Sequence, residues 1–93
     1  MHIEQVMELY SAALEELMGA QDYVKKADHA SDTETKGMYK NIARQELEHE
    51  QTFSKAAMRI VSAEPPESPL HAVWRHLSGH LNNWRMEIER KLS

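Results

Sequence analysis

Apolar residues recur at intervals of three and four along most of the 93-residue chain, which is the spacing of one face of an α-helix. No segment alternates apolar and polar residues as a half-buried strand would. The clearest break is the segment EPPESP at residues 64–69, which contains all 3 prolines. The pattern predicts an all-α single domain over residues 1–93: helices at 3–29, 32–62 and 69–92, and a loop at 63–68. The first two helices are expected to form an antiparallel hairpin, with the third packed beside it.

The first predicted helix carries apolar residues on a wide face. One row has the usual three-and-four spacing and is expected to lie in the core: Ile3, Val6, Met7, Tyr10, Leu14, Leu17 and Met18. At about 100° per residue, a second row lies beside it: Leu9, Ala12, Ala13, Glu16, Ala20, Tyr23 and Ala27. Together the rows are too wide for contact with one neighbouring helix, so we expect this helix to have a second partner.

Capping signals mark where the other two helices begin. The sequence SDTE at residues 31–34 has the spacing of a capping box, so the second helix is expected to start near Asp32. Ser68 followed by Pro69 is a favourable start for the third helix. Its apolar residues step by four and three and predict a seam against another helix: Leu70, Trp74, Leu77, Leu81, Trp84 and Ile88.

Composition narrows both the sources of stability and the classes of partner. A chain of 93 residues is near the lower limit for one self-sufficient core, and the absence of cysteine excludes disulfides and thiolate metal sites. A metal or a partner chain is therefore expected. The net charge of −4 argues against a nucleic-acid partner. With no signal peptide and no run of about 18 apolar residues, we expect a soluble, cytoplasmic chain without a membrane partner.

Candidate chemistry lies on the second predicted helix. Its apolar row consists of Tyr39, Ile42, Phe53, Ala57 and Ile60. By the same angular count, Glu46 falls in the middle of this row, with His49 about 60° to one side and Glu50 about 40° to the other. A buried carboxylate is costly unless it is protonated, hydrogen-bonded or neutralised by a cation, and several together favour a cation.

Three of these side chains could bind one metal ion. Glu46 and His49 are three residues apart and project side by side, and a glutamate on the facing antiparallel helix can complete the set. Glu16 is the best candidate because it lies on the row of small residues, where a partner backbone can come close. Carboxylate and imidazole ligands without sulfur suit iron or manganese, and zinc could also bind.

Simpler interpretations exist for each of these residues. Glu46 and His49 could form a satisfied polar contact, with Arg44 or Lys40 reaching in. Three further residues could support the site: Tyr23, Glu15 and Glu50. Tyr23 could hydrogen-bond a metal-binding carboxylate or donate an electron, or it could be an ordinary core tyrosine. Glu15 and Glu50 could be outer or bridging carboxylates, but ordinary surface charges are the favoured interpretation.

The segment from about Glu15 to Phe53 resembles the ferritin-like superfamily, especially rubrerythrin-type proteins and half-length encapsulated ferritins. The resemblance rests on EELMGAQDY followed by YKNIARQELEHE. The matching features are Glu16, the aromatic Tyr23 two turns later, the acidic turn SDTE, and the pair Glu46 and His49. The resemblance covers less than half of the chain.

Such a protein would use two copies of this chain. A di-iron carboxylate bundle takes a glutamate from each of two helices and a Glu-x-x-His pair from each of two others, and this chain has one of each. A homodimer, or a higher even-numbered oligomer, would complete a four-helix bundle holding two iron ions per dimer site. The resemblance implies that Glu16, Glu46 and His49 serve in oxidation of ferrous iron by dioxygen or peroxide. The lack of cysteine removes the rubredoxin-like iron of rubrerythrins.

The rival hypothesis is an interaction module. In that case the chain forms a helical homodimer in which Glu46 and His49 are buried polar groups that specify pairing. Such a dimer would hold no metal, or a metal with only a structural role.

Overall fold

The protein is described by a computed structural model that covers residues 2–93. It contains three helices, α1 (Ile3–His29), α2 (Thr33–Ser62) and α3 (Leu70–Leu92), and no strand occurs in this range. Each helix boundary lies within one residue of the position expected from the sequence. The predicted all-α class is confirmed. None of these helices is both long and apolar enough to cross a membrane.

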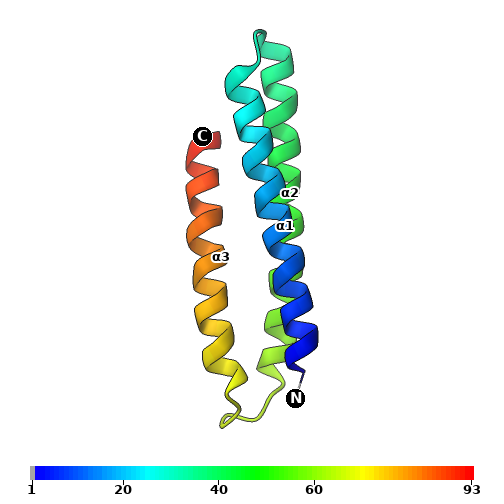
Figure 1. The fold of residues 1–93 in the computed structure, drawn as a ribbon, viewed down its shortest axis with the longest axis vertical. Helices are drawn as coiled ribbons and strands as arrows, with labels where there is room; N and C mark the ends of the chain where they lie inside the picture. Colours follow the sequence, from blue (N-terminus) through cyan, green and yellow to red (C-terminus); the bar gives the residue numbers. More distant parts are fainter. Residues whose placement is uncertain (1) are drawn as a thin grey trace.

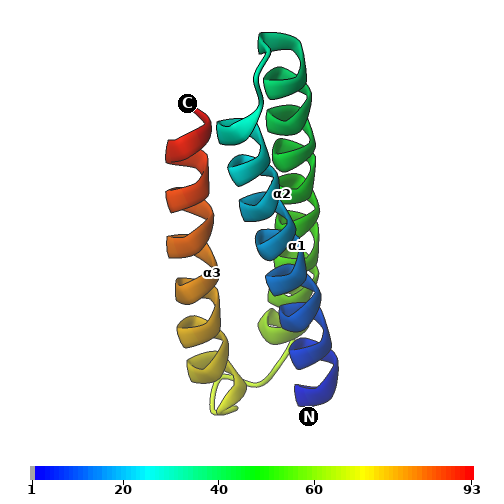
Figure 2. The same cartoon turned by 45° about the horizontal axis from the view of Figure 1, so that its top comes forward.

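Helices α1 and α2 form an antiparallel hairpin, and α3 runs along one side of it (Figure 1). Both views show that α3 ends before the tip of the hairpin (Figures 1 and 2). The molecule is elongated, with extents of 53 × 17 × 14 Å. Its accessible surface of 6109 Å² exceeds the roughly 5,500 Å² expected for a compact monomer of this mass. One face of the hairpin therefore remains without a covering helix.

Local capping explains where α2 and α3 begin. The side chain of Asp32 accepts a hydrogen bond of 2.8 Å from the backbone N–H of Thr35, so Asp32 is the N-cap of α2. This bond lowers the pKa of Asp32. The capping bond thus involves Asp32 rather than the Ser31 of the expected capping box. Ser68 Oγ accepts from the backbone N–H of Leu70 at 3.2 Å, but the N-cap of α3 is Pro69, one residue after the expected Ser68.

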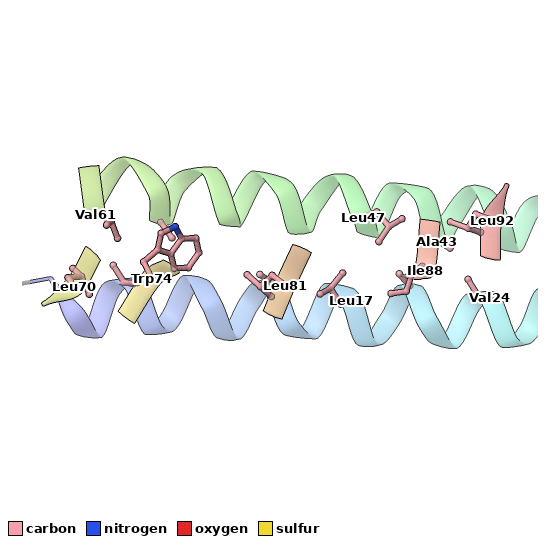
Figure 3. Close-up of a cluster of buried hydrophobic side chains, with 14 residues drawn as sticks. Leu17, Val24, Ala43, Leu47, Val61, Leu70, Trp74, Leu81, Ile88 and Leu92 are labelled. Atoms are coloured by element: carbon pink, nitrogen blue, oxygen red, sulfur yellow. The ribbon is translucent and has the colours of Figure 1, made fainter. Parts of the chain in front are cut away.

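The core is a narrow seam along all three helices (Figure 3). The buried residues are Val6, Ala13, Leu17, Ala20, Val24 and Ala27 of α1, Ala43, Leu47, Glu50, Ala57 and Val61 of α2, and Leu70, Trp74, Leu81, Ile88 and Leu92 of α3. Steps of three, four and seven place each set on one stripe of its helix. The alanines of α1 and α2 let these two backbones lie close together. The predicted seam of α3 is confirmed, with Leu77 and Trp84 half-buried at its edge.

The prediction for α1 was wrong in detail. Met7 and Met18, expected in the core, are 40% and 57% exposed, whereas Ala13 and Ala20 of the second row are fully buried in the chain's own hairpin. The buried seam runs between the two apolar rows, because the centre of a wide stripe is where one neighbour covers most area. Residues on the outer edge of each row, such as Met18 and Ala12, lie beside the buried seam and not in it.

The buried stripe of α2 is also rotated about the helix axis relative to the predicted stripe. As a result, Glu50 is buried where Glu46 was expected to be. The buried seam lies about 70° from the predicted row, on the side of Leu47. The sequence put Glu46 in the middle of the buried row and favoured a surface position for Glu50. Both expectations were wrong: Glu50 is fully buried in the seam, and Glu46 lies on its half-buried flank. The cause is α3, which packs against the Leu47 side of α2.

Polar contacts attach α3 to the hairpin. Arg85 of α3 donates through Nη1 to Glu50 Oε1 at 2.9 Å and to Oε2 at 3.3 Å. Ser54 Oγ also donates to Glu50 Oε2, at 2.5 Å. Trp84 Nε1 donates to Gln21 Oε1 at 2.8 Å, which links α3 to α1. Hydrogen-bonded partners thus satisfy the buried carboxylate, and they also hold α3 in place.

Replacing Arg85, the cation of the ion pair with Glu50, should destabilise the fold. Arg85→Met keeps the length of the side chain but leaves Glu50 as a buried charge, so we expect a loss of about 3 kcal/mol in the free energy of unfolding. Glu89→Gln is the matched control. Its carboxylate contacts Arg85 Nε at 3.4 Å but is 52% exposed, so the expected loss is below about 0.5 kcal/mol. Urea titration at equal protein concentrations measures both, and equal losses would contradict this account.

Candidate metal centre

Glu16 of α1 and the pair Glu46 and His49 of α2 lie next to one another on the hairpin. His49 Nδ1 and Glu16 Oε2 are 3.5 Å apart, a contact that is ionic when the imidazole is protonated. The His49 side chain is 62% exposed and that of Glu16 is 25% exposed. The site is therefore open to solvent on one side. It lies on the flank of α2 away from the Leu47 side, so α3 does not cover it.

The carboxyl group of Glu46 is tucked against α1. Its Oε2 atom is buried and has no hydrogen-bond partner among the described residues. This fit depends on Gly19, because a Cβ atom at that position would overlap Oε2 and would lie 2.8 Å from Cδ. The helix backbone at Gly19 thus makes room for the carboxyl group of Glu46 without offering it a donor.

The surroundings of Glu46 disfavour its charged form. Burial is the largest cause of a raised pKa at this carboxyl group, followed by the negative charge of Glu16. Asp22 adds to the effect, while His49 and Lys26 oppose it. A cation placed between these side chains would reverse the balance, since it would favour the ionised carboxylate.

One chain by itself does not form a complete metal site. Over residues 2–93, no group of three histidine, cysteine, aspartate or glutamate side chains is arranged to hold a metal ion. The donor types nevertheless suit a metal, because carboxylate oxygens and an imidazole face the same side of the hairpin, and one carboxylate oxygen lacks a partner.

The supporting residues named from the sequence lie in three different environments. Tyr23 is half-buried two turns from Glu16. The centroid of its ring lies 5.9 Å from that of the Tyr39 ring and 4.5 Å from Lys26 Nζ. Glu15 is exposed, as the surface interpretation predicted. Glu50 is buried and paired with Arg85, so it does not belong to this cluster.

Sequence reasoning missed the position of Gly19 against the Glu46 carboxyl group and the contact of Tyr39 with Tyr23. Gly19 follows Glu16 by three residues and therefore shares its face, and this spacing could have identified it. Tyr39 precedes Glu46 by seven residues, as Tyr23 follows Glu16 by seven, so an antiparallel hairpin brings the two rings together. By contrast, the pairing of Glu50 with Arg85 spans 35 residues and has no local signal.

Comparisons of the chain with protein-family models, with curated proteins and with solved structures found no match. Functional inference therefore rests on the chemistry of the chain itself.

Replacing the Glu46 carboxyl group, whose charged form is disfavoured, should stabilise the metal-free chain near neutral pH. A carboxyl group with a raised pKa in the folded state contributes stability that is complete below its unfolded pKa, near 4.5, and is lost as pH rises through the folded value. Glu46→Gln removes this dependence. We expect its urea midpoint at pH 7, in chelator, to exceed that of the wild type.

The advantage of Glu46→Gln should shrink as the pH is lowered towards 4.5, because the wild-type carboxyl group then becomes protonated. Glu48→Gln is the control, since Glu48 is exposed on the same helix and should show no such change. A constant advantage for Glu46→Gln across the pH range would contradict the assignment.

Proposed function

We propose that this chain is one half of a di-iron carboxylate protein that oxidises ferrous iron. Two copies would join through the face of the hairpin that α3 leaves uncovered, and would bind two iron ions between them. The observation that carries the proposal is the buried, unpartnered Oε2 atom of Glu46 beside Glu16 and His49.

An unpartnered carboxylate oxygen favours a bound cation. Leaving a buried acceptor unsatisfied costs about 1–3 kcal/mol, and a second carboxylate nearby adds repulsion. A divalent ion bound by Glu46, Glu16 and His49 would remove both penalties. Protonation of Glu46 is the alternative in the free chain, and it would be displaced when the metal binds.

A second copy would supply the ligands that one chain lacks. Symmetry would double Glu16, Glu46 and His49 to four carboxylates and two imidazoles, which is the ligand set of di-iron carboxylate bundles. Half-buried apolar side chains on this face support the proposed pairing. Apolar side chains flank the site and remain only half-buried: Leu9 and Tyr23 of α1, and Tyr39, Ile42, Phe53 and Ile60 of α2.

The protein groups would have separate tasks. His49, at the exposed edge of the cluster, would provide a neutral nitrogen ligand, and the two glutamates would neutralise charge as the metal is oxidised. Glu46 would be held against Gly19, which leaves its carboxyl group little freedom. Iron bound there would supply the electrons: oxidation of two ferrous ions to ferric ions would release two electrons, which with two protons would reduce one dioxygen to hydrogen peroxide or one hydrogen peroxide to two waters.

Removal of a proposed ligand should slow iron oxidation without unfolding the chain. We expect Glu46→Ala and His49→Ala each to lower the initial rate of ferrous iron oxidation in air at least about tenfold, since ligand loss weakens metal binding. Absorbance of ferric iron in the near ultraviolet measures the rate. Glu48→Gln, on the exposed side of the same helix, should retain the wild-type rate.

The same measurement separates the proposal from its rivals. Metal analysis should find two iron ions per dimer in the wild type. Wild-type protein that binds metal but does not oxidise ferrous iron would indicate a structural metal. Protein that binds neither iron, manganese nor zinc would indicate a helical interaction module, and either result would overturn the proposed activity.

The pairing face can be tested apart from the metal ligands. Ile42 is half-buried on this face but does not belong to the hydrophobic core, so Ile42→Arg should spare the monomer fold. We expect it to shift the sedimentation of the protein from dimer to monomer and to lower the oxidation rate in parallel. Met58→Arg is the matched control on α2, because Met58 is 50% exposed beside the groove between α2 and α3. A monomeric Ile42→Arg variant with full activity would exclude the shared site.

A further inference from the structure

Gly19 lies in the interior of α1, where glycine is an unfavourable residue. Its backbone has ordinary helical geometry, since no glycine among the described residues has a positive φ. At such a position alanine favours the folded helix over glycine by roughly fivefold in the equilibrium constant. The backbone conformation therefore does not require glycine at this position.

The space beside Gly19 is filled by the carboxyl group of Glu46 from α2. A Cβ atom at position 19 would overlap Glu46 Oε2, and would lie 2.8 Å from Cδ and 3.1 Å from Oε1. Non-bonded carbon atoms normally lie about 3.5–4.0 Å apart, so a methyl group would displace the carboxyl group by about 1 Å. Gly37 and Gly79 differ, because no packing neighbour lies within 4 Å of their Cβ positions.

We propose that Gly19 is a positioning residue of the iron site, because its bare backbone lets the Glu46 carboxyl group lie where it can bind metal. This role rests on the proposed function. Glu16 precedes Gly19 by three residues and shares its helix face, and His49 Nδ1 lies 3.5 Å from Glu16 Oε2. A carboxyl group that lies against Gly19 is thus kept beside the other two donors.

This role makes stability and metal binding change in opposite directions when Gly19 gains a methyl group. Glu46 Oε2 is buried here without a hydrogen-bond donor, so the metal-free chain gains stability when the carboxyl group moves out to water. Side chains occupy discrete rotamers, so the displaced carboxyl group takes another rotamer and leaves the other donors. A glycine that served only the packing of the helices would change both properties in the same direction.

Gly19→Ala tests this role in the metal-free and the metal-bound chain. Zinc is the probe, because it suits the same donors and is not oxidised. We expect Gly19→Ala to weaken zinc binding at least about tenfold in calorimetry and to raise the urea midpoint measured in chelator. Gly79→Ala is the matched control, which should raise the urea midpoint through helix propensity and leave the zinc affinity unchanged.

A second background separates an effect through Glu46 from a clash with a partner subunit. Glu46→Asp keeps a carboxylate but shortens the side chain by one methylene, so its carboxyl group does not reach Gly19. We expect Gly19→Ala to change the zinc affinity of Glu46→Asp by less than about twofold. A clash between subunits would weaken zinc binding equally in both backgrounds, and that result would overturn the assignment.

The remaining outcomes distinguish this role from the proposed function. A zinc affinity of Gly19→Ala equal to or tighter than that of the wild type would overturn the role of Gly19 and leave the proposed iron site standing. A lower urea midpoint in Gly19→Ala would also overturn it, because the methyl group would then disrupt the hairpin. A wild-type chain that binds no metal would overturn the proposed function, and the role of Gly19 with it.

Discussion

The position of α3 depends on one buried ion pair, and the remaining surfaces follow from it. Glu50 is fully buried in the seam of α2, where an unpaired carboxylate would be strongly unfavourable. Arg85 of α3 satisfies it, together with Ser54 of α2. This ion pair and the apolar seam of α3 together hold α3 on the Leu47 side of the hairpin. The opposite side, with Glu16, Glu46 and His49, is left uncovered.

Two glutamates one helical turn apart therefore have opposite environments. Glu50 faces a cation supplied by the chain, whereas Glu46 faces Gly19 and another carboxylate and has one oxygen without a donor. Burial and repulsion raise the pKa of Glu46. A cation from outside the chain would neutralise the Glu46 carboxylate, as Arg85 neutralises that of Glu50. This contrast is the physical basis of the proposed iron site.

The two unpartnered buried groups of residues 2–93 have opposite requirements. Glu46 Oε2 is an acceptor beside a carboxylate and an imidazole, and it requires a cation or a proton. Trp74 Nε1 is a buried donor that has no acceptor.

The sequence by itself determined the helical class, the limits of the three helices and the group of Glu16, Glu46 and His49. These features depend on local spacing and capping, and the hairpin brings residues of α1 and α2 together by simple antiparallel packing. The sequence did not determine which part of a wide apolar stripe is buried. Met18 was expected inside and Glu50 on the surface, and each is reversed. Only the tertiary structure decided this, because α3 rotates the seam of α2 through a contact between residues 35 positions apart.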